Sequence, residues 1–143
     1  MIRRKQRRQH GQALVELALA LPIFLLLLLG VFSLGLGVYT WNGLSQASRE
    51  IARTTSVYPA VVLGASTPSR KTIETQLGLV PGMADPPPAN FACVDISGNP
   101  VAHSPCTSGD FVRVTVTATF YPVALLGIGG PITMSSTSSL QIP

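Results

Sequence analysis

Charged side chains are scarce in this 143-residue chain, where only 11% of residues are Asp, Glu, Lys or Arg. A soluble domain of ordinary composition carries about 25%. Five of the ten basic residues precede Gly11, whereas all six acidic residues follow it. The chain after Gly11 therefore has five basic and six acidic residues, a net charge of −1. These counts predict a membrane-tethered protein, and they give no indication of a nucleic-acid partner, because the basic surplus belongs to the first residues alone.

Histidine and paired carboxylates, the usual acid–base groups of enzymes, are also nearly missing. Only one histidine, His103, lies beyond the N-terminal segment, and Ser104-Pro105-Cys106 follow it directly. A triad of His103, Asp110 and a serine can be drawn, but no spacing selects a serine and no GxSxG motif is present. We therefore expect no enzymatic activity, no small-molecule substrate and no cofactor.

The chain has only two cysteines, Cys93 and Cys106, with twelve residues between them. In an exported domain such a pair predicts a disulfide across a hairpin-like loop. The closed loop would contribute about 3 kcal/mol in the chain-entropy model. The alternatives are two free thiols and a metal site that adds His103. No CxxC motif and no second nearby histidine accompany the pair, so we expect no metal.

One long apolar run, Leu17–Tyr39, is interrupted only at Ser33. Its 23 residues would span about 34 Å as a helix, enough for the ~30 Å hydrocarbon core of a membrane. A cleaved signal peptide is the alternative, but its apolar region is about 7–15 residues long. Basic residues precede the run, and none follows until Arg49. The positive-inside rule then predicts a cytoplasmic N-terminus and a domain outside.

A glycine and a glutamate mark the start of this helix. Arg3, Arg4, Lys5, Arg7 and Arg8 precede Gly11, and Gln12-Ala13-Leu14-Val15-Glu16 follow it. This pattern resembles the processing site of type IV pilin-like proteins, which a prepilin peptidase cuts after the glycine. The resemblance implies that Gly11, Gln12 and Glu16 form the processing site.

Cleavage would give Gln12 a free α-amino group, with an ordinary pKa of about 7.7–8.0. It would lie four residues, or ~6 Å along the helix, from Glu16. We expect this amine to pair with Glu16 of a neighbouring subunit and so fix the offset between helices during assembly. The alternative is that Glu16 only reaches the lipid headgroups.

The rest of the chain predicts an α+β fold, a long N-terminal transmembrane helix that continues into a small exported domain with an antiparallel sheet. Phe111–Tyr121 alternates apolar and polar residues as a half-buried strand does. Phe91–Ser97 and Ile132–Ile142 are candidate partner strands. The uncharged loop 122–130 is expected to cover the domain core or the long helix, the alternative being a contact with a neighbour or the membrane surface. The sequence thus predicts a basic cytoplasmic leader at 1–11 and a long helix at 12–55, of which about 14–39 is transmembrane. A connector at 56–90 follows, with a short helix that begins at Thr67-Pro68, and residues 91–143 form an antiparallel β region.

The sequence resembles the TadE-like family in three places, which are Gln12-Ala13-Leu14-Val15-Glu16 followed by Leu21-Pro22, then Ala47-Ser48-Arg49-Glu50-Ile51-Ala52-Arg53, and more loosely the strand Val112-Arg113-Val114-Thr115-Val116. The resemblance implies a minor pseudopilin of the tight-adherence (Tad/Flp) pilus system, acting in type IVb pilus assembly and adhesion. Its implied partners are a prepilin peptidase, other pilins or pseudopilins, the Tad assembly machinery and the lipid of the bacterial cytoplasmic membrane. The alternative is a permanently anchored envelope protein whose outer domain binds a ligand or partner without polymerising.

Overall fold

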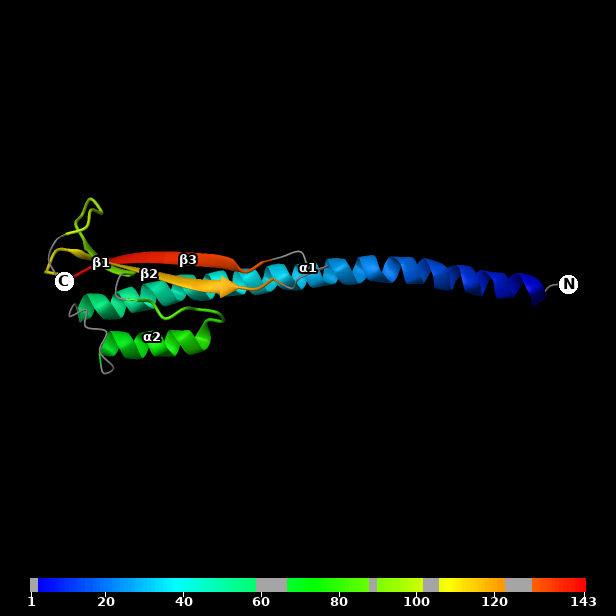
Figure 1. Cartoon of the computed structure of the whole chain (residues 1–143), viewed down its shortest axis with the longest axis horizontal. Helices are drawn as coiled ribbons and strands as arrows, with labels where there is room; N and C mark the ends of the chain where they lie inside the picture. Colours follow the sequence, from blue (N-terminus) through cyan, green and yellow to red (C-terminus); the bar gives the residue numbers. More distant parts are fainter. Residues whose placement is uncertain (1–2, 59–66, 88–89, 102–105, 123–129) are drawn as a thin grey trace.

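The computed structural model describes residues 3–58, 67–87, 90–101, 106–122 and 130–143. One helix, α1, runs the length of the molecule, and a sheet and a second helix pack along its C-terminal half (Figure 1). This arrangement confirms the predicted α+β class. The elements in chain order are α1 (Arg3–Val57), α2 (Pro68–Leu79), β1 (Phe91–Val94), β2 (Phe111–Phe120) and β3 (Ile132–Gln141).

Helix α1 is longer than the sequence predicts. Its 55 residues correspond to about 80 Å, and it begins at Arg3 instead of near Ala13. Gly11 lies inside the helix, because one glycine costs only about 1 kcal/mol and the flanking Arg, Lys and Gln residues favour helix. The helix ends at Val57, close to the predicted end at Thr55 and just before Pro59, which disfavours helical backbone in the residue that precedes it.

Helix α2 begins where the sequence predicts. Thr67 is the N-cap and accepts a hydrogen bond from the Arg70 backbone N–H at 3.2 Å, and Pro68 occupies the first turn. The helix continues through Gly78 and stops at Leu79. Its buried residues Ser69 and Ile73 face the core, and the Thr55 hydroxyl of α1 donates to the Ser69 hydroxyl at 3.3 Å.

The sheet has the order β1-β2-β3 with both pairs antiparallel. The alternation predicted for β2 is confirmed, because Val112, Val114, Val116 and Ala118 are buried. Strand β1 stops at Val94, short of the predicted end at Ser97. It stops there because residues 95–99 form a tight turn, in which Gly98 has a φ of +83° and its N–H donates to the Asp95 carbonyl at 2.9 Å.

A short extended segment, residues 82–84, completes the edge of β2 beyond the end of β1. Met83 forms an antiparallel bridge with Ala118, the Ala84 N–H donates to the Thr117 carbonyl at 2.9 Å, and the Thr119 N–H donates to the Gly82 carbonyl at 2.8 Å. This segment lies within residues 56–90, which the sequence predicts to be a connector with one short helix. Strand β2 therefore has partners along both edges and is the centre of the sheet.

A single core joins α1, α2 and the sheet. One face of α1 forms a wall of it, since Leu44, Ala47, Ile51 and Ala52 have no exposed surface. A partly buried polar contact also crosses this interface, where the hydroxyl oxygens of Ser48 on α1 and Ser136 on β3 lie 3.1 Å apart. We call this unit, from Thr40 of α1 to the end of the chain, the folded domain.

Two sequence predictions lie outside the described residues. One is the expectation that His103 is neither a triad member nor a metal ligand, and the other is that Leu125, Leu126 and Ile128 of the uncharged loop cover the domain core or the long helix. Both stay predictions.

Candidate functional site: an exposed apolar helix and the domain at its end

The segment of α1 from Leu14 to Tyr39, called the bare half of α1 below, is apolar and largely exposed. Its large apolar side chains from Leu14 to Tyr39 are all between 39% and 73% exposed. In the part of the chain that the structure describes, α1 is the one helix long and apolar enough to cross a membrane, and none of its most apolar stretch is buried in the protein. The core helix of a soluble protein would be covered. This surface therefore needs lipid or other apolar helices around it.

The three residues predicted for processing and assembly lie together at the start of this surface. Gln12 and Glu16 are exposed and stand one helical turn apart on the same face. No described neighbour lies within 4 Å of the point where a Cβ on Gly11 would stand. The geometry leaves the site open to an enzyme, and the roles of Gly11, Gln12 and Glu16 stay predictions.

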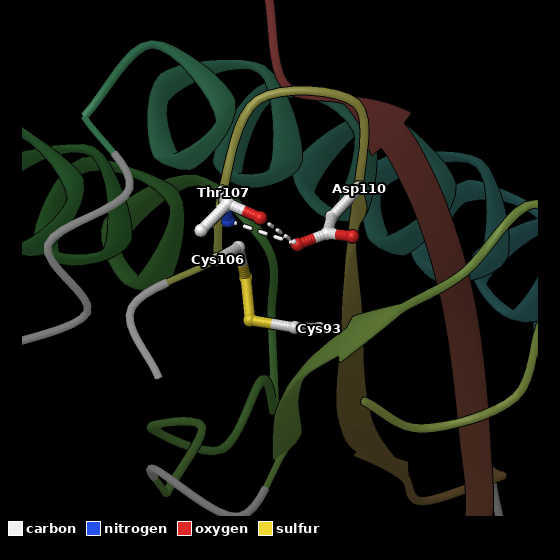
Figure 2. Close-up of a disulfide and its surroundings, with 4 residues drawn as sticks. All are labelled: Cys93, Cys106, Thr107 and Asp110. Atoms are coloured by element: carbon white, nitrogen blue, oxygen red, sulfur yellow. Dashed lines mark hydrogen bonds between the residues drawn. A yellow bond between two sulfur atoms is a disulfide. The ribbon is translucent and has the colours of Figure 1, made fainter. Parts of the chain in front are cut away.

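The predicted disulfide is present at the opposite end of the molecule. Cys93 on β1 is bonded to Cys106, just before β2, with their Cα atoms 5.3 Å apart (Figure 2). Thr107 and Asp110 form a turn beside it, in which the Thr107 N–H and hydroxyl both donate to Asp110 Oδ2 at 2.9 and 2.8 Å (Figure 2). This turn leads the chain from the buried Cys106 into β2. The bond joins the two strands at their distal ends.

A second turn, residues 95–99, follows β1. The Asn99 backbone N–H donates to Asp95 Oδ1 at 2.8 Å, and the Asn99 side-chain amide donates to Asp95 Oδ2 at 3.4 Å. These bonds, the backbone one first, hold the pKa of the Asp95 carboxyl below its ordinary value of 3.8. The guanidinium of Arg113 on β2 adds a bond to the Gly98 carbonyl at 3.1 Å. The turn is thus held by bonds within it and by a bond from β2.

An ion cluster on α2 was not found from the sequence. Arg70 Nη1 donates to both carboxylate oxygens of Asp85, at 2.7 and 2.8 Å, and its Nε donates to Glu74 at 3.2 Å. The hydrogen bond to Asp85 is the main cause that raises the pKa of Arg70. The i,i+4 spacing of Arg70 and Glu74 is visible in the sequence, but Asp85 is fifteen residues away. The cluster holds α2 to the segment that completes the sheet.

An apolar cleft of about 350 Å³ lies where the sheet meets the bare half of α1. The Phe120 ring covers Gly37, with ring carbons 3.6 and 3.7 Å from where a Cβ would stand. The sequence does not predict this cleft, because its walls come from segments that lie far apart in the chain. Its lining residues are Ser33, Leu34, Gly37, Val38, Trp41, Phe120, Ile132 and Met134.

Among the described residues, no group of three or more His, Cys, Asp or Glu side chains is placed to hold a metal ion. The ion cluster of Arg70, the disulfide and the two turns stabilise the fold. The remaining feature of the described residues is the apolar surface of α1 with the cleft at its end. The arrangement is suited to anchoring and association.

Residues 11–53 match the family described as TadE-like protein. The match confirms the resemblance noted in the sequence, and it covers both the bare half of α1 and most of the half that forms the core wall. No curated protein and no solved structure matched the chain. The family match indicates a Tad pilus-associated protein of the cell envelope.

Proposed function

We propose that the chain is a minor pseudopilin of the Tad pilus system, anchored by α1 in the bacterial cytoplasmic membrane with its N-terminus inside and its folded domain outside. The observation that carries the proposal is the continuity of α1. One unbroken helix is exposed and apolar up to Tyr39 and forms the core wall from Leu44 onward. The family match spans this change of environment.

In this proposal a prepilin peptidase cuts after Gly11. The bond lies on an exposed helical segment, between the basic leader and the apolar run. Glycine is the weakest helix former apart from proline, so the helix unwinds more easily at this turn than at its neighbours. Removal of the leader leaves the new amine of Gln12 one turn from Glu16.

The intact mass of the protein, expressed together with its own prepilin peptidase, tests the proposal. A mature protein that lacks Met1–Gly11 supports it. Gly11→Leu should keep the full-length mass, because a side chain there crowds the scissile bond. Gly35→Leu is the matched control, since Gly35 also lies in α1 with open space around its Cβ position, and this variant should be cut normally.

The second candidate is a permanently anchored envelope protein whose folded domain binds a partner without polymerising. A wild-type protein that keeps Met1–Gly11 in the presence of an active peptidase would favour it and contradict the pseudopilin proposal.

A further inference from the structure

The proposed membrane span sets the depth of each residue along α1, because a helix rises 1.5 Å per residue. If the hydrocarbon core begins at Leu17, next to the carboxylate of Glu16, its ~30 Å corresponds to 20 residues and ends near Leu36. The headgroup layer adds about 5–7 Å on each side, or about three to five further residues. The outer headgroup layer then covers α1 from about Leu36 to Trp41.

The end of the sheet that faces the bare half of α1, where β2 ends and β3 begins, lies beside this part of α1 (Figure 1). We call it the near end of the sheet. Phe120, the last residue of β2, packs over Gly37 of α1, and the methyl carbon of Met134 on β3 lies 4.0 Å from the same Cβ position. Ile132, where β3 begins, lines the same cleft. The folded domain therefore does not stand clear of the membrane surface, and its near end overlaps the headgroup layer.

The composition of this end fits that position. Trp41, Tyr39 and Tyr121 are 50%, 60% and 71% exposed, and Ile132 is 50% exposed. Tryptophan and tyrosine are the residues enriched at membrane–water interfaces. No charged residue occurs in 33–41, 117–122 or 130–134.

The far end of the sheet is different. Its turns and strand ends carry Asp95, Asp110 and Arg113. The domain is thus charged away from the membrane and uncharged toward it, as a surface that enters the interface requires.

We propose that the near end of the sheet is a second membrane contact, in which an acyl chain of an outer-leaflet lipid occupies the cleft between α1 and Phe120. The cleft is apolar and opens beside Leu34 and Val38, which are 73% and 60% exposed on the lipid-facing part of α1. Its volume is about 350 Å³, and in the proposed span lipid surrounds its opening. The inference rests on the proposed membrane span.

Trp41 is the only tryptophan of the chain, so fluorescence quenching by lipids brominated on their acyl chains can read out depth. The full chain is reconstituted in such vesicles as single-tryptophan variants made on Trp41→Phe. Ile132→Trp reports on the near end of β3, and Gln141→Trp, at the far end of the same strand, is the matched control. Ile132→Trp should lose emission, most with bromines near the headgroups, and Gln141→Trp should keep it.

Phe24→Trp separates the two possible failures, because Phe24 lies well inside the proposed span. If Phe24→Trp is quenched and Ile132→Trp behaves like Gln141→Trp, the span stands and the second contact is wrong. If Phe24→Trp also keeps its emission, the span and the proposed function fail.

Native mass spectrometry of the reconstituted protein tests the occupant of the cleft. The wild type should retain a bound phospholipid, and Ile132→Asp should lose it. Thr133→Asp is the control, since it adds the same charge at the same level on the opposite face of β3, and it should retain the lipid. A wild type that retains a second copy of the chain and no lipid would overturn the proposal.

Discussion

Gly82 and Thr119 approach so closely that no side chain fits between them. The Thr119 N–H donates to the Gly82 carbonyl at 2.8 Å, and a Cβ on Gly82 would collide with the Thr119 carbonyl oxygen. Gly82 also has a φ of +73°, a backbone conformation that other residues rarely adopt. This contact closes the edge of β2 that β1 leaves open.

Gly82→Ala should therefore destabilise the folded domain through both backbone strain and collision. Gly109→Ala is the matched control, because Gly109 has a φ of +98° but open space around its Cβ position. The free energy of unfolding of Gly109→Ala should fall only by the strain energy, about 1–2 kcal/mol. The free energy of unfolding of Gly82→Ala should fall by about 1–3 kcal/mol more. Equal losses in denaturant unfolding of the full chain in detergent would contradict the collision.

The Cys93–Cys106 disulfide should supply about 3 kcal/mol of stability, because it closes a loop in the unfolded chain between residues 13 positions apart. The double variant Cys93→Ala/Cys106→Ala should melt more than about 10 °C below the wild type, since 1 kcal/mol moves the Tm of a domain this small by about 4–8 °C. Reductant should lower the Tm of the wild type and leave the variant unchanged. An unchanged Tm in the variant would show that the bond adds nothing to stability. Cleavage after Gly11 should be unaffected in either case.

Acid should weaken the turn at residues 95–99. The pKa of Asp95 is held below its ordinary value by the hydrogen bonds from Asn99. A lowered pKa means that the stabilisation is fully present above the unfolded-state pKa, about 3.9, and is lost as the pH falls through the folded-state pKa. Asp95→Asn should keep an acceptor for the Asn99 N–H but lose this dependence. The Tm difference between wild type and variant should narrow below about pH 4, and a constant difference would contradict the prediction.

Glu16→Gln should insert and be cut like the wild type but fail to associate with pilin subunits. The carboxylate would be the partner of a neighbouring subunit's new α-amino group, and an amide carries no charge to pair with it. Co-purification with pilin and counts of assembled pili measure the effect, with the mature mass as the control for processing. Normal piliation by the variant at wild-type protein levels would exclude the pairing role and leave Glu16 as a residue that reaches the headgroups.

Local patterns were enough to predict the main elements. The apolar run Leu17–Tyr39 predicted the membrane-length part of α1, and the alternation in Phe111–Tyr121 predicted a strand with one buried face. The N-cap at Thr67 was predicted correctly because a cap depends on neighbouring residues alone. The cysteine pairing followed from there being only two cysteines.

The features that the sequence did not predict join residues far apart in the chain. The bridge of Met83 to Ala118, the ion pair of Arg70 with Asp85 and the cleft beneath Phe120 depend on register and packing, which no local pattern specifies. The start of α1 at Arg3 was missed because Gly11 was taken as a boundary. The cost of one glycine is too small to stop a helix whose flanking residues favour it.

Because β2 and β3 lie alongside α1 and not across it (Figure 1), the folded domain has a preferred direction of mechanical strength. A pull on the N-terminus of α1 loads the helix–sheet interface in shear, so its contacts along the whole length share the force at once. A sideways pull on the chain end after β3 would instead peel that strand from β2 one hydrogen bond at a time. A subunit held by its helix and drawn along its axis is therefore loaded in the direction in which its fold resists most.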